Sequence, residues 1–90
     1  MDIQDVNTTT GTQVTKAKLT GWKVERADDG SLSCLHAFVN LYENQEKADN
    51  DEIASNKAIE ITSDLLVFQA SKTYDERVTF LEGKITSTLS

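Results

Sequence analysis

Asp28-Asp29-Gly30-Ser31 lies between two segments that are rich in alternating, aromatic and β-branched residues. An Asp-Gly pair in such a setting is a strong indication of a β-hairpin. The two predicted strands cover residues 14–25 and 32–42, and they hold most of the large apolar side chains in the first half of the chain. The sequence therefore predicts a fold built around this hairpin.

The type of turn sets the register of the hairpin. If Asp29 and Gly30 are the central residues of a type I′ turn, both adopt a positive φ, which Gly accepts freely and Asp tolerates. A three-residue loop with a bulge would instead shift the register by one residue and turn Trp22 toward His36. We favour the two-residue turn, because it places apolar residues opposite one another on one face. The predicted cross-strand pairs are Arg26–Ser33, Val24–Leu35, Trp22–Ala37 and Thr20–Val39.

A third strand and a C-terminal helix follow. Residues 57–62 alternate as Lys-Ala-Ile-Glu-Ile-Thr, which is typical of a strand with one exposed face. A short helix is predicted over residues 65–70, and Thr73-x-x-Glu76 matches a capping box at the start of a longer helix. Apolar residues then recur at helical spacing and form one stripe: Tyr74, Val78, Leu81, Ile85 and Leu89.

The C-terminal part of this helix is open to a second interpretation. Gly83 inside a helix costs about 1 kcal/mol relative to Ala. Residues 78–88 could instead form a second hairpin about Glu82-Gly83, or the helix could end at Gly83 and leave an extended tail. We expect the helix to continue at least through Leu81.

The predicted fold class is α+β. It consists of a three-stranded antiparallel meander, made of the hairpin about Asp29-Gly30 and the strand near residues 57–62, covered by the C-terminal helix. A small all-β sandwich is the alternative.

The first residues differ in composition from the remainder. Residues 1–12 are polar and threonine-rich, and we expect a flexible N-terminal arm there, followed by a single small domain over residues 13–90. An extended segment of this kind is suited to adding a strand to the sheet of a neighbouring subunit. Its candidate contact residues are Thr8, Thr9 and Thr10.

Composition argues against several classes of partner. The formal net charge is -6 and the isoelectric point is near 4.6. Because nucleic-acid binding depends on Lys and Arg that neutralise phosphates, we expect no direct nucleic-acid partner, and no membrane partner for the same reason. The chain has no apolar run near 18 residues and no signal segment, so we expect a cytoplasmic location, or the virion if the protein is viral.

The sequence shows no catalytic or cofactor signature. Cys34 and His36 are two residues apart on one predicted strand and share a face, which could be half of a metal site or a thiolate–imidazole pair. They are the one cysteine and the one histidine of the chain, too few for a Cys/His zinc site. The run Asp49-Asn50-Asp51 lacks the glycine of a calcium-binding EF-hand loop. We therefore expect a non-enzymatic protein with no cofactor and no metal site.

Two surfaces are candidates for protein contacts. One helix cannot cover every apolar residue of the second half of the chain, so some apolar surface is left for a subunit contact. The candidate residues there are Phe68, Tyr74, Val78, Phe80, Leu81 and Ile85. The second surface is acidic and comprises Glu43, Glu46, Asp49, Asp51 and Glu52.

The threonine-rich start Thr8-Thr9-Thr10-Gly11-Thr12, the hairpin and the strand-to-helix tail over residues 59–89 resemble the layout of small virion proteins of tailed bacteriophages. The resemblance implies a structural or assembly protein that works by protein–protein contacts, as a homo-oligomer or as a head, connector or tail component. The alternative is an acidic intracellular inhibitor or regulator whose residues 43–60 occupy a basic site on a nucleic-acid-handling partner.

Overall fold

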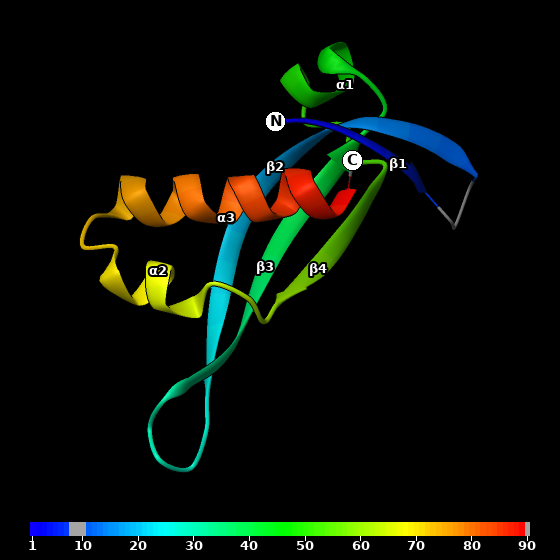
Figure 1. The fold of residues 1–90 in the computed structure, drawn as a ribbon. Helices are drawn as coiled ribbons and strands as arrows, with labels where there is room; N and C mark the ends of the chain where they lie inside the picture. Colours follow the sequence, from blue (N-terminus) through cyan, green and yellow to red (C-terminus); the bar gives the residue numbers. More distant parts are fainter. Residues whose placement is uncertain (8–10, 90) are drawn as a thin grey trace.

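The structure is a computed structural model and describes residues 1–7 and 11–89. Within these residues the chain forms one antiparallel sheet with the strand order β1-β2-β3-β4. The sheet is curled, and α3 lies across its concave face (Figure 1). The strands are β1 (Asp2–Asn7), β2 (Thr12–Arg26), β3 (Leu32–Tyr42) and β4 (Ser55–Ile61), and the helices are α1 (Gln45–Asp49), α2 (Leu65–Ala70) and α3 (Tyr74–Leu89).

The α+β class is confirmed, but the predicted number of three strands is wrong, because residues assigned to the N-terminal arm form β1. β1 pairs with β2 from Asn7 opposite Thr12 to Asp2 opposite Lys16. Ile3 is buried in the core. The sequence gives little sign of this strand, because the segment lacks the apolar alternation of the other strands. Thr8, Thr9 and Thr10 lie outside the described residues.

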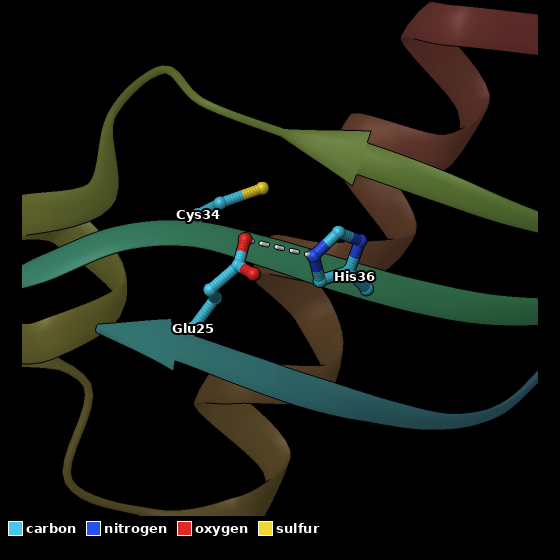
Figure 2. A group of neighbouring side chains, drawn as sticks. All are labelled: Glu25, Cys34 and His36. Carbon is cyan, nitrogen blue, oxygen red and sulfur yellow. Dashed lines mark hydrogen bonds and ion pairs between the residues drawn. The ribbon is translucent and has the colours of Figure 1, made fainter. Parts of the chain in front are cut away.

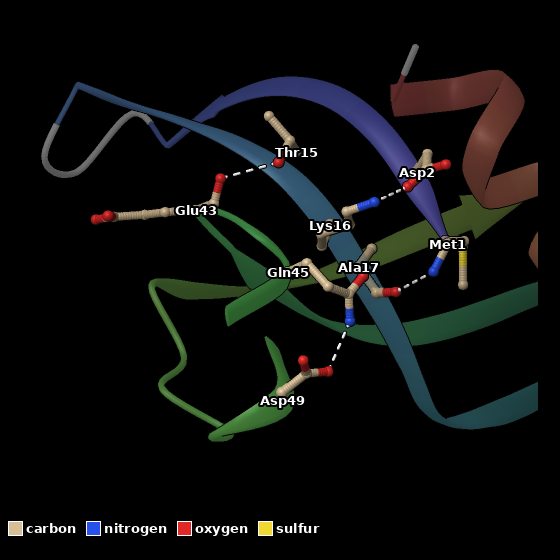
Figure 3. A network of polar contacts seen from close by, with 8 residues as sticks. All are labelled: Met1, Asp2, Thr15, Lys16, Ala17, Glu43, Gln45 and Asp49. Carbon is tan, nitrogen blue, oxygen red and sulfur yellow. Dashed lines mark hydrogen bonds and ion pairs between the residues drawn. The ribbon is translucent and has the colours of Figure 1, made fainter. Parts of the chain in front are cut away.

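Polar contacts hold the first residues on β2 (Figure 3). The amino group of Met1 donates to the carbonyl of Ala17 at 2.8 Å, and the N–H of Ala17 donates to the carbonyl of Met1 at 3.0 Å. Lys16 forms an ion pair with Asp2, which lowers the pKa of the Asp2 carboxyl through that hydrogen bond. These contacts make β1 an integral strand of the sheet.

The hairpin turn differs from the predicted type I′ turn. The N–H of Ala27 donates to the carbonyl of Ser31 at 2.9 Å, so that Asp28, Asp29 and Gly30 form a three-residue loop. Gly30 has a φ of +84°, whereas Asp29 keeps a negative φ. The Asp29 carboxylate accepts from the hydroxyl of Ser31 at 2.6 Å and from its N–H at 2.9 Å, and these bonds lower the pKa of Asp29. This is the alternative turn that the sequence left open.

A bulge restores the predicted register a few residues beyond the loop. The loop places Arg26 opposite Leu32, not opposite Ser33 as predicted, and Ser33 is then the extra residue of the bulge. The predicted pairs of Val24 and Trp22 therefore hold even though the turn is different. The register beyond the bulge is Glu25↔Cys34, Val24↔Leu35, Lys23↔His36 and Trp22↔Ala37.

A second bulge lies at Thr20, so that Leu19 takes the predicted place of Thr20 opposite Val39. The Thr20 hydroxyl donates to the carbonyl of Phe38 at 3.0 Å. Bulges bend a strand and increase its twist, in keeping with the curl of the sheet. β4 covers Ser55–Ile61, so it includes most of the predicted alternating segment, and it pairs antiparallel to β3 as predicted.

Helix α3 continues to Leu89, so the second hairpin does not form and Gly83 lies inside the helix. The Thr73 hydroxyl accepts from the N–H of Glu76 at 3.1 Å, as a capping box requires. The Glu76 carboxylate accepts from the N–H of Lys72 at 3.0 Å, and not from Thr73 as the motif predicts.

The core lies between α3 and the concave face of the sheet. From α3 it takes three residues of the predicted stripe, and α2 adds one side chain. The buried residues of the cluster are Ile3, Val14, Ala17, Leu35, Ala37, Val39, Leu41, Ile59, Ile61, Phe68, Leu81, Ile85 and Leu89.

Candidate functional site

Apolar side chains are exposed where α2 meets the start of α3. The segment Leu65-Leu66-Val67-Phe68 is a run of four apolar residues, and a helix turns by about 100° per residue, so the four cannot share one face. Phe68 is buried and Leu65 is half-buried, whereas Leu66 is 78% and Val67 55% exposed. Tyr74 at the start of α3 is 70% exposed. We name Leu66, Val67, Tyr74 and Phe80 the α2–α3 patch.

Aromatic rings support this patch from beneath. The ring of Phe68 meets Trp22 edge-on at a centroid distance of 6.4 Å and lies 5.8 Å from the ring of Phe80. The Tyr74 ring lies 5.6 Å from Trp22. The Arg77 guanidinium lies 5.8 Å from the Phe68 ring. Tyr74 is therefore held by a packed neighbour although most of its surface faces solvent.

A groove of about 420 Å³ lies between α2 and α3. Val67 and Phe80 supply its apolar lining, and Gly83 leaves room because its side chain is a hydrogen atom. The ammonium group of Lys84 donates to Asp64 at 2.5 Å and to the Ser63 hydroxyl at 2.9 Å. The groove thus has an apolar lining and a rim whose charges are paired within the chain.

The structure separates the predicted contact residues into two groups. Phe68 and Tyr74 each contact Trp22, and Phe80 contacts Phe68, with Tyr74 the most exposed of them. Leu81 and Ile85 are fully buried between α3 and the sheet, so a partner cannot reach them. Val78 is half-buried.

Leu66 and Val67 are contact candidates that the predicted list of contact residues does not include. Their signal is the run of four apolar residues in a helix only six residues long, because so short a helix buries a single face.

The acidic residues lie on α1, just before it at Glu43, and on the turn that follows it, and the side chains of all five are exposed. Three of them have partners within the chain. Gln45 donates to Asp49 at 2.7 Å, the Tyr42 hydroxyl donates to Asp51 at 2.6 Å, and Lys47 pairs with Glu52 at 3.5 Å. Figure 3 shows the Gln45–Asp49 contact and the Glu43 side chain extended away from the strands. The other acidic candidate, Glu46, lies in the first turn of α1.

Cys34 and His36 share one face of β3, and Glu25 reaches them from β2 (Figure 2). The Nε2 atom of His36 lies 3.3 Å from the Glu25 carboxylate, and the Cys34 sulfur lies 3.6 Å from the carboxylate of Glu60 on β4. Cys34 is only 5% exposed. Burial, and then the negative charge of Glu60, raise the pKa of the Cys34 thiol, so the thiol stays protonated at neutral pH and is a weak nucleophile.

Comparison of the chain with protein-family models, with curated proteins and with solved structures finds no match. Within residues 1–7 and 11–89, no helix has the length and apolar character needed to cross a membrane.

Proposed function

We propose that this chain is a non-enzymatic protein that works by protein–protein contact, and that it associates with a second copy of itself through the α2–α3 patch. The observation that carries the proposal is the exposure of Leu66, Val67 and Tyr74 on adjoining helices. Exposed apolar side chains on neighbouring helices mark a candidate contact surface, and tyrosine is enriched in the energetically important centre of interfaces. The ring contact of Tyr74 with Trp22 restricts the tyrosine side chain and so lowers the entropy that binding would cost.

The distribution of charge favours a second copy as the partner. α1 precedes β4 and α2 follows it, so the acidic residues and the patch lie at opposite ends of a seven-residue strand, about 23 Å apart at 3.3 Å per residue. Screening limits charge repulsion to roughly 8 Å at physiological ionic strength. Two copies can therefore join their patches while their acidic segments stay apart.

Charges of both signs border the patch, which suits a two-fold contact. Asp64 and Lys84 lie beside the groove, and Asp75 and Arg77 lie in the first turns of α3. In a two-fold interface the same surface of both copies is in contact. Acidic groups at the border of one patch can therefore face basic groups at the border of the other.

The finer proposal is a component of a larger assembly, such as the head, connector or tail of a phage virion. Its support is the resemblance in layout to small virion proteins.

The non-enzymatic part of the proposal is supported by the burial of Cys34 and the raised pKa of its thiol.

The test is the mass in solution, measured by light scattering during size-exclusion chromatography over a range of concentrations. One chain is 10.0 kDa, and we expect the mass to rise toward an integer multiple of that value as concentration rises. The double variant Leu66→Ser/Val67→Ser should stay monomeric, because it removes apolar area that is already in solvent and so leaves the core intact. Ile53→Ser is the matched control, since Ile53 is 47% exposed but lies outside the patch.

A mass of 10.0 kDa at every concentration, at low and at high salt, would contradict self-association. Salt-sensitive capture of a basic partner by that monomer, lost when the charges of Glu43 and Glu46 are removed, would then support the acidic inhibitor or regulator instead.

A further inference from the structure

Four side chains with metal-binding atoms meet on the face of the sheet that α3 does not cover. Residues alternate between the two faces of a strand, so Cys34 and His36 on β3 point away from the face that carries Leu35 and Ala37. Glu25 lies opposite Cys34 on β2, and Glu60 lies opposite His36 on β4. Three neighbouring strands therefore carry a thiol, an imidazole and two carboxylates on this face, with the Glu60 carboxylate in contact with Cys34.

Two of the separations match those of neighbouring ligands around one small cation. Two nitrogen or oxygen ligands at about 2.1 Å from a tetrahedral zinc ion lie about 3.4 Å apart, and a sulfur and an oxygen ligand lie about 3.6 Å apart. The observed distances are 3.3 Å between His36 and Glu25 and 3.6 Å between Cys34 and Glu60. One ligand atom each of Glu25, Cys34 and His36 all lie within 4.8 Å of one another. To share one ion, the atoms that lie farther apart than tetrahedral ligands would have to move together by side-chain rotation.

We propose that Glu25, Cys34 and His36, with Glu60 as the fourth ligand, form a binding site for a zinc-type divalent cation. The thiolate and imidazole select Zn²⁺ or Co²⁺ over Ca²⁺ and Mg²⁺, which prefer sites made only of oxygen atoms. When the ion binds, the Cys34 thiol releases its proton to solvent, and the sulfur takes up the ion in its place. The role of the ion is structural, because its ligands join β2, β3 and β4.

Metal titration of the metal-free chain, freed of any histidine tag, tests the site. Calorimetry with ZnCl₂ should give one ion per chain, and CoCl₂ should give the near-ultraviolet charge-transfer band of a cobalt–thiolate bond. Because the ion binds only the folded sheet, saturating Zn²⁺ should raise the midpoint of thermal unfolding, on the order of 10 °C at 100 times Kd. CaCl₂ and MgCl₂ should produce none of these effects.

Zn²⁺ binding by single-residue variants distinguishes this site from weak binding of the ion to exposed carboxylates elsewhere on the surface. Cys34→Ser should abolish the cobalt–thiolate band, and His36→Asn and Glu25→Gln should each weaken Zn²⁺ binding at least about tenfold, as should Glu60→Gln. Circular dichroism of each metal-free variant reports whether the fold is retained. Glu46→Gln, which removes an exposed acid on α1, is the matched control and should bind as the parent does.

Two results would overturn the inference. One is the absence of stoichiometric Zn²⁺ binding by the parent chain. The other is binding that survives both Cys34→Ser and His36→Asn, which would place the ion on the acidic segment and leave His36–Glu25 as an ordinary polar contact.

Discussion

Tyr42 is the largest fully buried side chain among the described residues, and its hydroxyl donates to Asp51 at 2.6 Å. Burial, and then this hydrogen bond, raise the pKa of Tyr42 above its ordinary value of 10.0. The folded chain thus holds the phenolic proton more tightly than the unfolded chain does. The protonated Tyr42 hydroxyl therefore contributes to the free energy of unfolding. This contribution is fully present at pH values below the pKa of the unfolded state, and it is lost as the pH rises through the pKa of the folded state.

We therefore expect Tyr42→Phe to have two effects. At about pH 7 it should lower the free energy of unfolding by about 1 kcal/mol, because one hydrogen bond is lost while exposed Asp51 stays hydrated. Above about pH 10, the free energy of the parent should fall more steeply with pH than that of the variant. Urea denaturation at both pH values measures this. Tyr74→Phe, at an exposed tyrosine, should leave the value at pH 7 unchanged, and equal pH slopes for the parent and Tyr42→Phe would contradict the argument.

At the scale of elements, alanine substitutions at two glycines are expected to have opposite effects on the stability of the fold. Gly83 lies inside α3, and an added Cβ would meet open space, so Gly83→Ala should stabilise the chain by about 1 kcal/mol. Gly30 also faces open space but has a φ of +84°, so Gly30→Ala should destabilise it by a similar amount, about 1 kcal/mol. Thermal unfolding of both variants measures the difference. A loss of stability in Gly83→Ala would contradict a continuous helix through residue 83.

Elements with strong local signals were predictable from the sequence. The capping box at Thr73 and the apolar stripe of α3 depend on residues within the helix itself, and together they outweigh the cost of Gly83. The turn at Gly30 was not predictable, because a bulge at Ser33 compensates the one-residue shift and the pairing beyond it is the same for either turn. β1 was missed because its contacts are made with β2 and the core, and its own sequence does not alternate.

The candidate sites were predictable to different degrees. Tyr74 follows from the helical spacing of apolar residues, and Phe68 and Phe80 follow from the apolar surface that one helix cannot cover. The exposure of Val67 depends on how α2 sits on the sheet. The approach of Glu25 to Cys34 was already implied by the predicted register. The approach of Glu60 depends on β4, because Glu60 lies opposite His36 only in the register of the third and fourth strands.

At the scale of the whole molecule, β1 converts a three-stranded meander into a curled sheet that encloses α3. Ile3 is 4% exposed and belongs to the same buried cluster as Leu81 and Ile85, so the first residues share the core with the last helix. A domain of this size has an expected total stability of only about 5–15 kcal/mol, so one strand is a large part of it. The N-terminal segment should therefore unfold together with the domain.

Ile3→Ala tests this cooperativity. Removing a buried isoleucine side chain leaves a cavity, and we expect a loss of about 2–4 kcal/mol and a lower midpoint of thermal unfolding. Ile53→Ala is the matched control, because Ile53 is 47% exposed and the same truncation there should cost much less. Hydrogen exchange gives an independent measure, since the N–H of Ala17 is held by the carbonyl of Met1 and should be protected in the parent. Equal stability of the two variants, with rapid exchange at Ala17, would instead show that residues 1–7 are a detached arm, free to reach a neighbouring subunit.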